Sequence, residues 1–327
     1  MSNIYEHGLD KNAANFSPMT PISFIERAAK IYPNKVAVVH GGLKRTWSET
    51  YARTRQLASS LIKAGVGVGD TVAVMLPNTP PMVEAHFGVP MVGAVLNSLN
   101  TRLDPEAIAF MLNHGEAKVV IVDPEFSGVM KKALAIAQAE SPRDILVIDV
   151  IDEAYEGASE KLGSIDYDTF ISAGDANHAW RMPQDEWESI CLNYTSGTTG
   201  RPKGALYSHR STILHAYASA LPGSLSISSA EVIMPVVPMF HVNAWGVVYS
   251  AAAAGARLVF PGPKMGDGET LARLINDEGV ELALGVPTVW LALVNHLREL
   301  PDLLWRQIPF LEDLRVANDR RERCPQL

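Results

Sequence analysis

The feature that most constrains this fold is a repeated alternation of short apolar strands with helices. Thr71 to Leu76 is a continuous apolar segment, of the kind that is buried on both faces of a parallel sheet. It is followed by a helical pattern over Pro81 to Gly93, a strand from Ala94 to Leu99, a helix from Pro105 to His114 and a strand from Lys118 to Asp123. Strands that alternate with helices pair in parallel through right-handed crossovers. The sequence therefore predicts an α/β fold.

Local signals mark several element ends. Thr20-Pro21 is typical of an N-cap followed by proline at the first helical position, with a helix that runs to Tyr32. Val36 to His40 is predicted to be a strand, turned by Gly41-Gly42. Thr46 and Glu49 have the spacing of a capping box at the start of a helix through Lys63.

The alternation resumes after a less regular, acidic region from Ile151 to Gln184. Further strands are expected at 190–194, 232–237, 256–260 and 282–286, with helices at 210–221, 245–254, 270–278 and 288–299. We therefore expect two α/β lobes, residues 1–184 and residues 185–327, with a glycine-rich loop in the second.

Composition narrows the class of partner. Hydrophobic residues make up 47% of the chain and charged residues 20%, as in a folded globular protein. The net charge of -8 argues against a nucleic-acid partner, because phosphate neutralisation needs a basic surface. Two cysteines, and a beginning that mixes charged residues without an apolar run, favour the cytoplasm over secretion.

One uncharged stretch, Val232 to Ala256, is long enough to span a bilayer. Pro235 and Pro238 interrupt helical hydrogen bonding, and His241 and Asn243 would lie near the middle of the span. We therefore expect a buried strand, a loop and an alanine-rich helix here, and no transmembrane segment.

The segment with the clearest chemistry is Thr195 to Gly200, which places hydroxyls and glycines between a strand and a helix. Glycines allow successive backbone N–H groups to point into one concavity that binds phosphate oxygens, and Lys203 adds a positive charge at its edge. The hexapeptide alone is also compatible with a flexible surface loop. Five positions after Gly197 stands Pro202 and not glycine, so this is not a Walker A loop.

Other candidate residues have ordinary structural interpretations. A histidine in an apolar run, such as His241, is more often a core residue, and an aromatic such as Trp245 mostly serves packing. His209 and His215 are interpreted as partly exposed helix residues. The spacing of histidines and cysteines predicts no structural zinc site.

The run from Tyr194 to Arg210, Tyr-Thr-Ser-Gly-Thr-Thr-Gly-Arg-Pro-Lys-Gly-Ala-Leu-Tyr-Ser-His-Arg, resembles the signature of the AMP-forming acyl-CoA synthetase family. The resemblance extends from about Pro18 to Arg315 and includes Leu99-Asn-Thr-Arg-Leu103 and Pro238-Met-Phe-His-Val-Asn-Ala-Trp245. Within the family the chain is most similar to fatty-acyl and medium-chain acyl-CoA ligases. The two lobes would then be the large N-terminal domain of an adenylate-forming enzyme.

This resemblance implies an ATP-dependent ligase of fatty-acid metabolism. A carboxylic acid would attack the α-phosphate of ATP to give an acyl-adenylate, and coenzyme A would then displace AMP, with Mg²⁺ as cofactor. Lys203 and His241 would be catalytic, His241, Val242 and Trp245 would bind the acid, and Thr195 would hold the metal. The phosphates would contact Thr195, Ser196, Gly197, Thr198, Thr199, Gly200 and Lys203. A homodimer is also expected.

The resemblance weakens toward Leu327. Charged residues run from Asp319 to Arg323 where the family has a glycine-rich segment that packs on adenine. The family's aromatic-Gly-x-Thr-Glu motif and small C-terminal domain with its catalytic lysine do not appear within the 327 residues. We therefore expect a truncated ligase with impaired activity. The alternatives are a non-catalytic nucleotide- or acyl-binding fragment, a decayed ligase product, and an adenylating relative with another acceptor.

Overall fold

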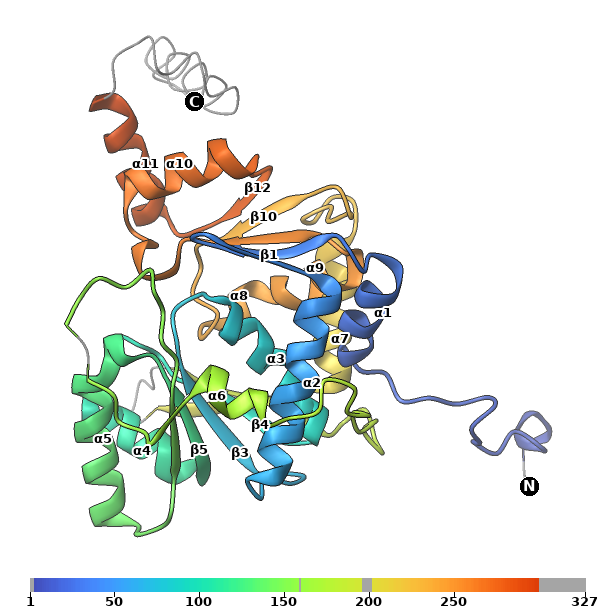
Figure 1. Ribbon diagram of the computed structural model, residues 1–327. Coiled ribbons are helices and arrows are strands. Elements are labelled where there is room, and N and C mark those ends of the chain that lie inside the picture. Colours follow the sequence, from blue (N-terminus) through green and yellow to red (C-terminus); the bar gives the residue numbers. More distant parts are fainter. Residues whose placement is uncertain (1–2, 159, 196–201, 300–327) are drawn as a thin grey trace.

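The computed structural model describes residues 3–158, 160–195 and 202–299, and shows two β-sheets with helices packed between and around them (Figure 1). The larger sheet has the strand order β7-β6-β5-β3-β4-β8-β9. Its strands are β3 (Thr71–Met75), β4 (Val95–Ser98), β5 (Ala117–Val122), β6 (Leu146–Asp149), β7 (Ile165–Asp166), β8 (Ser189–Thr195) and β9 (Lys203–Ser208). All neighbours are parallel except the β8–β9 hairpin.

The smaller sheet has the order β12-β10-β11-β1-β2. It consists of β1 (Val36–His40), β2 (Leu43–Thr46), β10 (Val232–Pro235), β11 (Arg257–Phe260) and β12 (Leu282–Leu284). β1 and β2 form an antiparallel hairpin around the expected Gly41-Gly42 turn, and the other pairs are parallel. The predicted α/β class is confirmed.

The helices cover both sheets (Figure 1). The α-helices are α1 (Ile22–Ile31), α2 (Trp47–Lys63), α3 (Pro80–Val92), α4 (Pro105–His114), α5 (Ser127–Glu140), α6 (Tyr167–Ser172), α7 (His209–Ala220), α8 (Val242–Trp245), α9 (Val247–Ala254), α10 (Gly268–Glu278) and α11 (Pro287–Glu299). The described part of the chain also contains the short 3-10 helices η1 (Ile4–Glu6), η2 (Pro124–Phe126) and η3 (Gly262–Lys264). α2 has the predicted capping box, with the Thr46 side chain and the Glu49 side chain bonded reciprocally to backbone amides.

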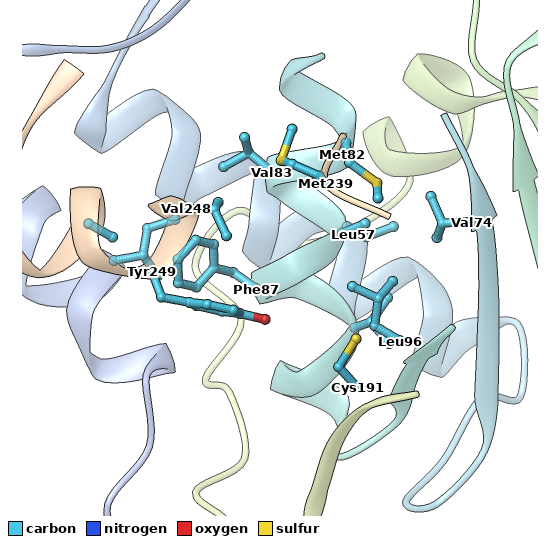
Figure 2. Close-up of a cluster of buried hydrophobic side chains, with 14 of the residues drawn as sticks. Leu57, Val74, Met82, Val83, Phe87, Leu96, Cys191, Met239, Val248 and Tyr249 are labelled. Atoms are coloured by element: carbon cyan, nitrogen blue, oxygen red, sulfur yellow. The ribbon is translucent and has the colours of Figure 1, made fainter. Parts of the chain in front are cut away.

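Helix α3 lies between the two sheets and contacts strands of both (Figure 1). Its side chains are buried on every side, with Pro81 the one residue that is only half-buried. Figure 2 shows Met82, Val83 and Phe87 of this helix within a cluster that also includes Leu57 of α2 and Tyr249 of α9. A helix that is apolar all round is typical of a fully buried position.

One charged side chain lies within this buried helix. Glu84 is fully buried, and its Oε1 accepts hydrogen bonds from Arg53 at 2.7 Å and Arg45 at 3.2 Å. Its Oε2 accepts from the Tyr167 hydroxyl at 2.8 Å. The carboxylate therefore joins α3 to β2, α2 and α6, and its pairing makes the burial of a charge tolerable.

A crevice of about 670 Å³ lies between the end of β1 and the loop after β6. Arg45, Arg53 and Tyr167, which bind Glu84, line part of it. His40 Nε2 lies 3.0 Å from both carboxylate oxygens of Asp152, and Arg53 also pairs with Asp168 at 2.7 Å. Burial alone would lower the pKa of His40, but Asp152 raises it above its ordinary value. The cations of this crevice are therefore already neutralised by carboxylates.

Several details differ from expectation. His209, expected to be partly exposed, is buried because its Nδ1 pairs with Thr20 Oγ1 at 2.8 Å across a long sequence separation. Strand β9 and helix α5 were not expected, and α6 and β7 form within the region predicted to be irregular. Strands from before and after residue 184 occur in both sheets, so the expected two-lobe division remains a prediction about chain organisation.

The uncharged stretch from Val232 to Ala256 is divided into β10, α8 and α9. Within the three described segments, no helix is both long enough and apolar enough to cross a membrane.

The packing of α3 on α2 yields a stability prediction. A Cβ at Gly88 would lie 2.8 Å from Leu57 Cδ2 and 2.9 Å from the Thr54 carbonyl oxygen. Gly88→Ala should therefore lower the free energy of unfolding by about 1–3 kcal/mol. Gly128→Ala, at an exposed position of α5 where a Cβ meets nothing within 4 Å, should be neutral or stabilise by about 0.4–1 kcal/mol. Urea denaturation measures both, and equal effects would contradict the packing described.

A buried carboxyl that interacts electrostatically with Asp152 and His40, that of Asp123, yields a pH prediction. Burial raises the pKa of Asp123 to about 7, although the hydrogen bond that its Oδ1 accepts from the Glu125 amide acts against this. The stability that the protonated carboxyl contributes is present below its unfolded pKa, and it is lost as pH rises through about 7.

Asp123→Asn keeps the acceptor and stays neutral, so it should stabilise the protein at pH 8 by about 1–3 kcal/mol relative to wild type and show no advantage at pH 4. Urea denaturation at both pH values measures the difference, with Asp277→Asn, at an exposed position, as control. A variant that tracks the wild type from pH 4 to pH 8 would show that Asp123 is ionised throughout.

Candidate active site

The β8–β9 hairpin positions the two ends of the expected phosphate loop. Tyr194 pairs with Gly204 and Thr195 with Lys203 in the antiparallel register. Thr195 Oγ1 lies 3.5 Å from the Lys203 carbonyl oxygen, and both residues are exposed. A hydroxyl and an ammonium group thus flank the base of one loop. The predictions for Ser196, Gly197, Thr198, Thr199 and Gly200 lie outside the described residues.

The second group of candidates, at 241–245, lies on an unusual turn. Val242, Asn243 and Ala244 have φ of 49° and Trp245 has φ of 57°, so four consecutive non-glycine residues have left-handed backbone. Ala244 N donates to the His241 carbonyl and Gly246 N to the Asn243 carbonyl, each at 3.0 Å. The predicted helix from Trp245 is therefore wrong at its start, and right-handed α9 begins at Val247.

This backbone is strained. The left-handed helical conformation costs roughly 1–2 kcal/mol for each residue with a Cβ. Strained residues of this kind persist only where their surroundings hold them, and they cluster at functional sites. His241 and Val242 are exposed, and 39% of Trp245 is accessible, so the turn presents these side chains at the surface and not to the core.

A buried hydrogen bond joins the turn to the hairpin. Asn243 Oδ1 accepts from Asn193 Nδ2 at 3.1 Å and from the Cys191 thiol at 3.5 Å, and both partners lie on β8. Because Thr195 ends the same strand, the structure connects the phosphate-loop candidates to His241, Val242 and Trp245 through β8. Sequence reasoning missed Asn193 and Asn243, and an amide within each of two apolar runs was the available signal.

Beside the turn lies a cavity of about 280 Å³. Its lining comes from β9, α7, the left-handed turn and α9. The lining residues are Tyr207, Ser211, Thr212, His215, Val242, Asn243, Gly246 and Tyr249. Of these, Val242 was predicted to be a site residue. Gly246 has φ of 68°, and a Cβ there would lie 2.7 Å from His215 Nδ1. His215 was expected to be a partly exposed helix residue, and it lies exposed on α7, where it also lines this cavity.

A neutral histidine lies behind the turn. Burial lowers the pKa of His86 on α3 to about 4, while the Met82 carbonyl and the Asn243 side chain act in the opposite direction. The ring is therefore uncharged at neutral pH, and its Nδ1 donates to the Met82 carbonyl at 2.8 Å. The turn is thus backed by an uncharged polar surface.

Comparison with known proteins identifies the chemistry to which this arrangement is related. The family model described as AMP-binding enzyme matches residues 25–315. An acetate–CoA ligase of Humulus lupulus is 43% identical over 254 residues, covering 75% of this chain and 44% of the relative. A medium-chain-fatty-acid–CoA ligase of Ectopseudomonas oleovorans is 41% identical over 276 residues, covering 83% of this chain and 50% of the relative. The chain spans about half the length of the curated relatives it matches.

Solved structures agree with this fold. An anthranilate CoA ligase in complex with anthranoyl-AMP superposes with a TM-score of 0.74 at 20% identity, covering 86% of this chain and 52% of that chain. The N-terminal domain of FACL13 from Mycobacterium tuberculosis superposes with a TM-score of 0.71 at 25% identity, covering 89% of this chain and 68% of that one. The resemblance to the acyl-CoA synthetase family is confirmed: the chain belongs to the AMP-binding enzyme family, that of the AMP-forming acyl-CoA ligases.

Proposed function

We propose that this chain activates a carboxylic acid with ATP, as an acyl-adenylate destined for coenzyme A. The observation that supports this best is the shared strand β8. It ends at Thr195, which faces Lys203 across the hairpin, and it is bonded through Asn193 to the turn of His241, Val242 and Trp245. Thr195, which suits phosphate or its metal ion, therefore ends the strand to which the turn with the acyl-site candidates is hydrogen-bonded.

The phosphate half of the proposal rests on charge. A carboxylate that approaches a polyphosphate is repelled by it, so positive charge must be placed where the negative charges meet. The exposed ammonium group of Lys203 would supply part of it, with the amides of Ser196 to Gly200 around the phosphates. Mg²⁺ would neutralise phosphate oxygens, and the exposed Thr195 hydroxyl fits it as an oxygen ligand for a hard cation.

The acid half rests on the cavity beside the turn. Its volume of about 280 Å³ lies just below the usual range of small-molecule sites, about 300–1,000 Å³, which suits an acyl group of modest length. Val242 and Tyr249 would contact the chain, His241 would lie beside the carboxylate and the α-phosphate, and Trp245 would gate the entrance. Coenzyme A as the acceptor is inferred from the named relatives. The homodimer and the cytoplasmic location remain predictions.

The function is tested by ATP–pyrophosphate exchange with acids of four to twelve carbons. The assay uses this chain, and also a chimera that adds the remaining half of the Ectopseudomonas oleovorans relative. We expect exchange from the chimera with at least one acid. No exchange with any acid would reject the ligase, and stoichiometric ATP binding without exchange would favour a non-catalytic nucleotide-binding protein.

Lys203→Ala should reduce exchange by about 10²–10³-fold and weaken ATP binding, because it removes a positive charge from the transferring phosphates. Lys131→Ala is the matched control, since Lys131 is equally cationic but pairs with Glu160 on an exposed surface at 2.8 Å. Titration calorimetry and the exchange assay measure both variants. An unchanged rate for Lys203→Ala would remove this lysine from the proposed mechanism.

Gly246→Ala tests the acyl cavity. Its methyl group would meet His215 and reduce the cavity, so octanoate binding should weaken at least tenfold while ATP binding stays within twofold. Gly65→Ala is the control, because Gly65 also has positive φ, 83°, but a Cβ there meets nothing within 4 Å. Both variants should lose similar stability, about 1–2 kcal/mol. Gly65→Ala should keep wild-type octanoate affinity. If Gly246→Ala keeps it too, the acid binds elsewhere.

A further inference from the structure

The left-handed turn needs an explanation beyond its own hydrogen bonds. Val242 to Trp245 each carry a Cβ in a conformation that such residues disfavour. Backbone bonds within the turn include those from Ala244 N to the His241 carbonyl and from Gly246 N to the Asn243 carbonyl. A right-handed turn could form equivalent bonds without the strain, so contacts from outside the turn must select the left-handed form.

The polar side chain of the turn that points inward is that of Asn243. It is 4% exposed, whereas its neighbour Val242 is 40% exposed. Its oxygen accepts from Asn193 Nδ2 at 3.1 Å and from the weakly donating Cys191 thiol at 3.5 Å. Asn193 is itself 4% exposed, so loss of this acceptor would leave a buried amide unpaired.

The other side of this amide faces α3. His86 donates from Nδ1 to the Met82 carbonyl, which leaves its Nε2 as an acceptor. Within the described residues Nε2 has no partner at hydrogen-bond distance, and the Asn243 side chain is the polar side chain that acts on this ring. Since the oxygen of Asn243 is bonded to β8, its nitrogen remains as the group that can donate toward His86.

We propose that Asn243 is a positioning residue: its side-chain amide anchors the left-handed turn to β8 and so places His241, Val242 and Trp245 relative to Thr195 and Lys203. This role rests on the proposed function, because it assigns a purpose to the geometry of that site. The anchoring itself is a property of the fold and can be measured without turnover.

The chemistry of the anchor determines which substitutions could replace it. Aspartate would keep the acceptor for Asn193 but would bury a charge and lose the donor toward His86. Alanine would lose the hydrogen bonds that Asn243 accepts from Asn193 and Cys191 and would keep the backbone strain. Glycine would lose the same bonds, but it adopts positive φ readily and so removes part of the strain at this position. Comparing alanine with glycine at residue 243 therefore separates the effect of the lost hydrogen bonds from the effect of the backbone strain.

The experiment compares Asn243→Ala, Asn243→Gly and Asn193→Ala in this chain. Hydrogen exchange is followed at the amides of Ala244 and Gly246, and octanoate and ATP binding are followed by calorimetry. We expect at least tenfold faster exchange at both amides in Asn243→Ala and in Asn193→Ala, with octanoate affinity at least tenfold weaker and ATP affinity within threefold. Asn243→Gly should lie between Asn243→Ala and the wild type in both measurements. Asn276→Ala, at an exposed position, is the control and should match the wild type.

Unchanged exchange at Ala244 and Gly246 in Asn243→Ala would overturn the proposal, as would equal losses in the alanine and glycine variants. If Asn243→Ala does not fold, Asn193→Ala decides alone, because it breaks the same bond from the β8 side and leaves the turn sequence intact. A wild type that binds neither ligand would reject the proposed function, while the exchange data would still decide the anchoring.

Discussion

The structure depends on the complete burial of α3 between two sheets. A helix of thirteen residues that exposes almost none of its surface must be covered on all sides, and the cover comes from both sheets and from α2. This requirement draws together segments that are far apart in sequence: Figure 2 shows Phe87 packed with Tyr249 of α9 and Leu96 of β4 near Cys191 of β8. The edge-to-face contact of Phe87 and Tyr249, with centroids 5.4 Å apart, places α9 and the turn before it against α3. The candidate site is thus a consequence of how the core closes.

The crevice beside His40 and the cavity beside the left-handed turn differ in the chemistry of their lining residues. The larger crevice is lined by His40, Arg45 and Arg53, but Asp152, Glu84 and Asp168 already neutralise these groups. The smaller cavity is lined mainly by ring and methyl groups, and it borders a strained turn. A charged group that has a partner in the fold stabilises the fold, whereas strain and an unshared apolar surface suit a ligand. The smaller cavity is therefore the better candidate for an acyl group.

Sequence patterns predicted those elements whose periodicity or end signals are local. Helix 105–114 and the capping box of α2 are confirmed because their determinants lie within a few residues. Strand β9 was missed, because its exposed Lys203 and Leu206 lack the pattern of a buried strand and pairing with β8 determines its structure. The burial of His209 depends on Thr20, and the left-handed turn depends on Asn193. Neither partner is visible from the residue's own neighbourhood in the sequence.

The same distinction applies within the candidate site. Thr195 and Lys203 were found through a contiguous motif, since a phosphate nest is built from neighbouring backbone amides and needs glycines in series. The acyl side has no such continuity: Val242, His215 and Tyr249 meet only because α7 and α9 pack together. Asn243 belongs to both cases. It lies within the recognised Pro238–Trp245 segment, but its hydrogen-bond partner Asn193 lies on β8, the strand that leads to the phosphate loop. A short motif can therefore identify the reaction of a family, while the placement of its acid depends on a buried amide that the motif does not explain.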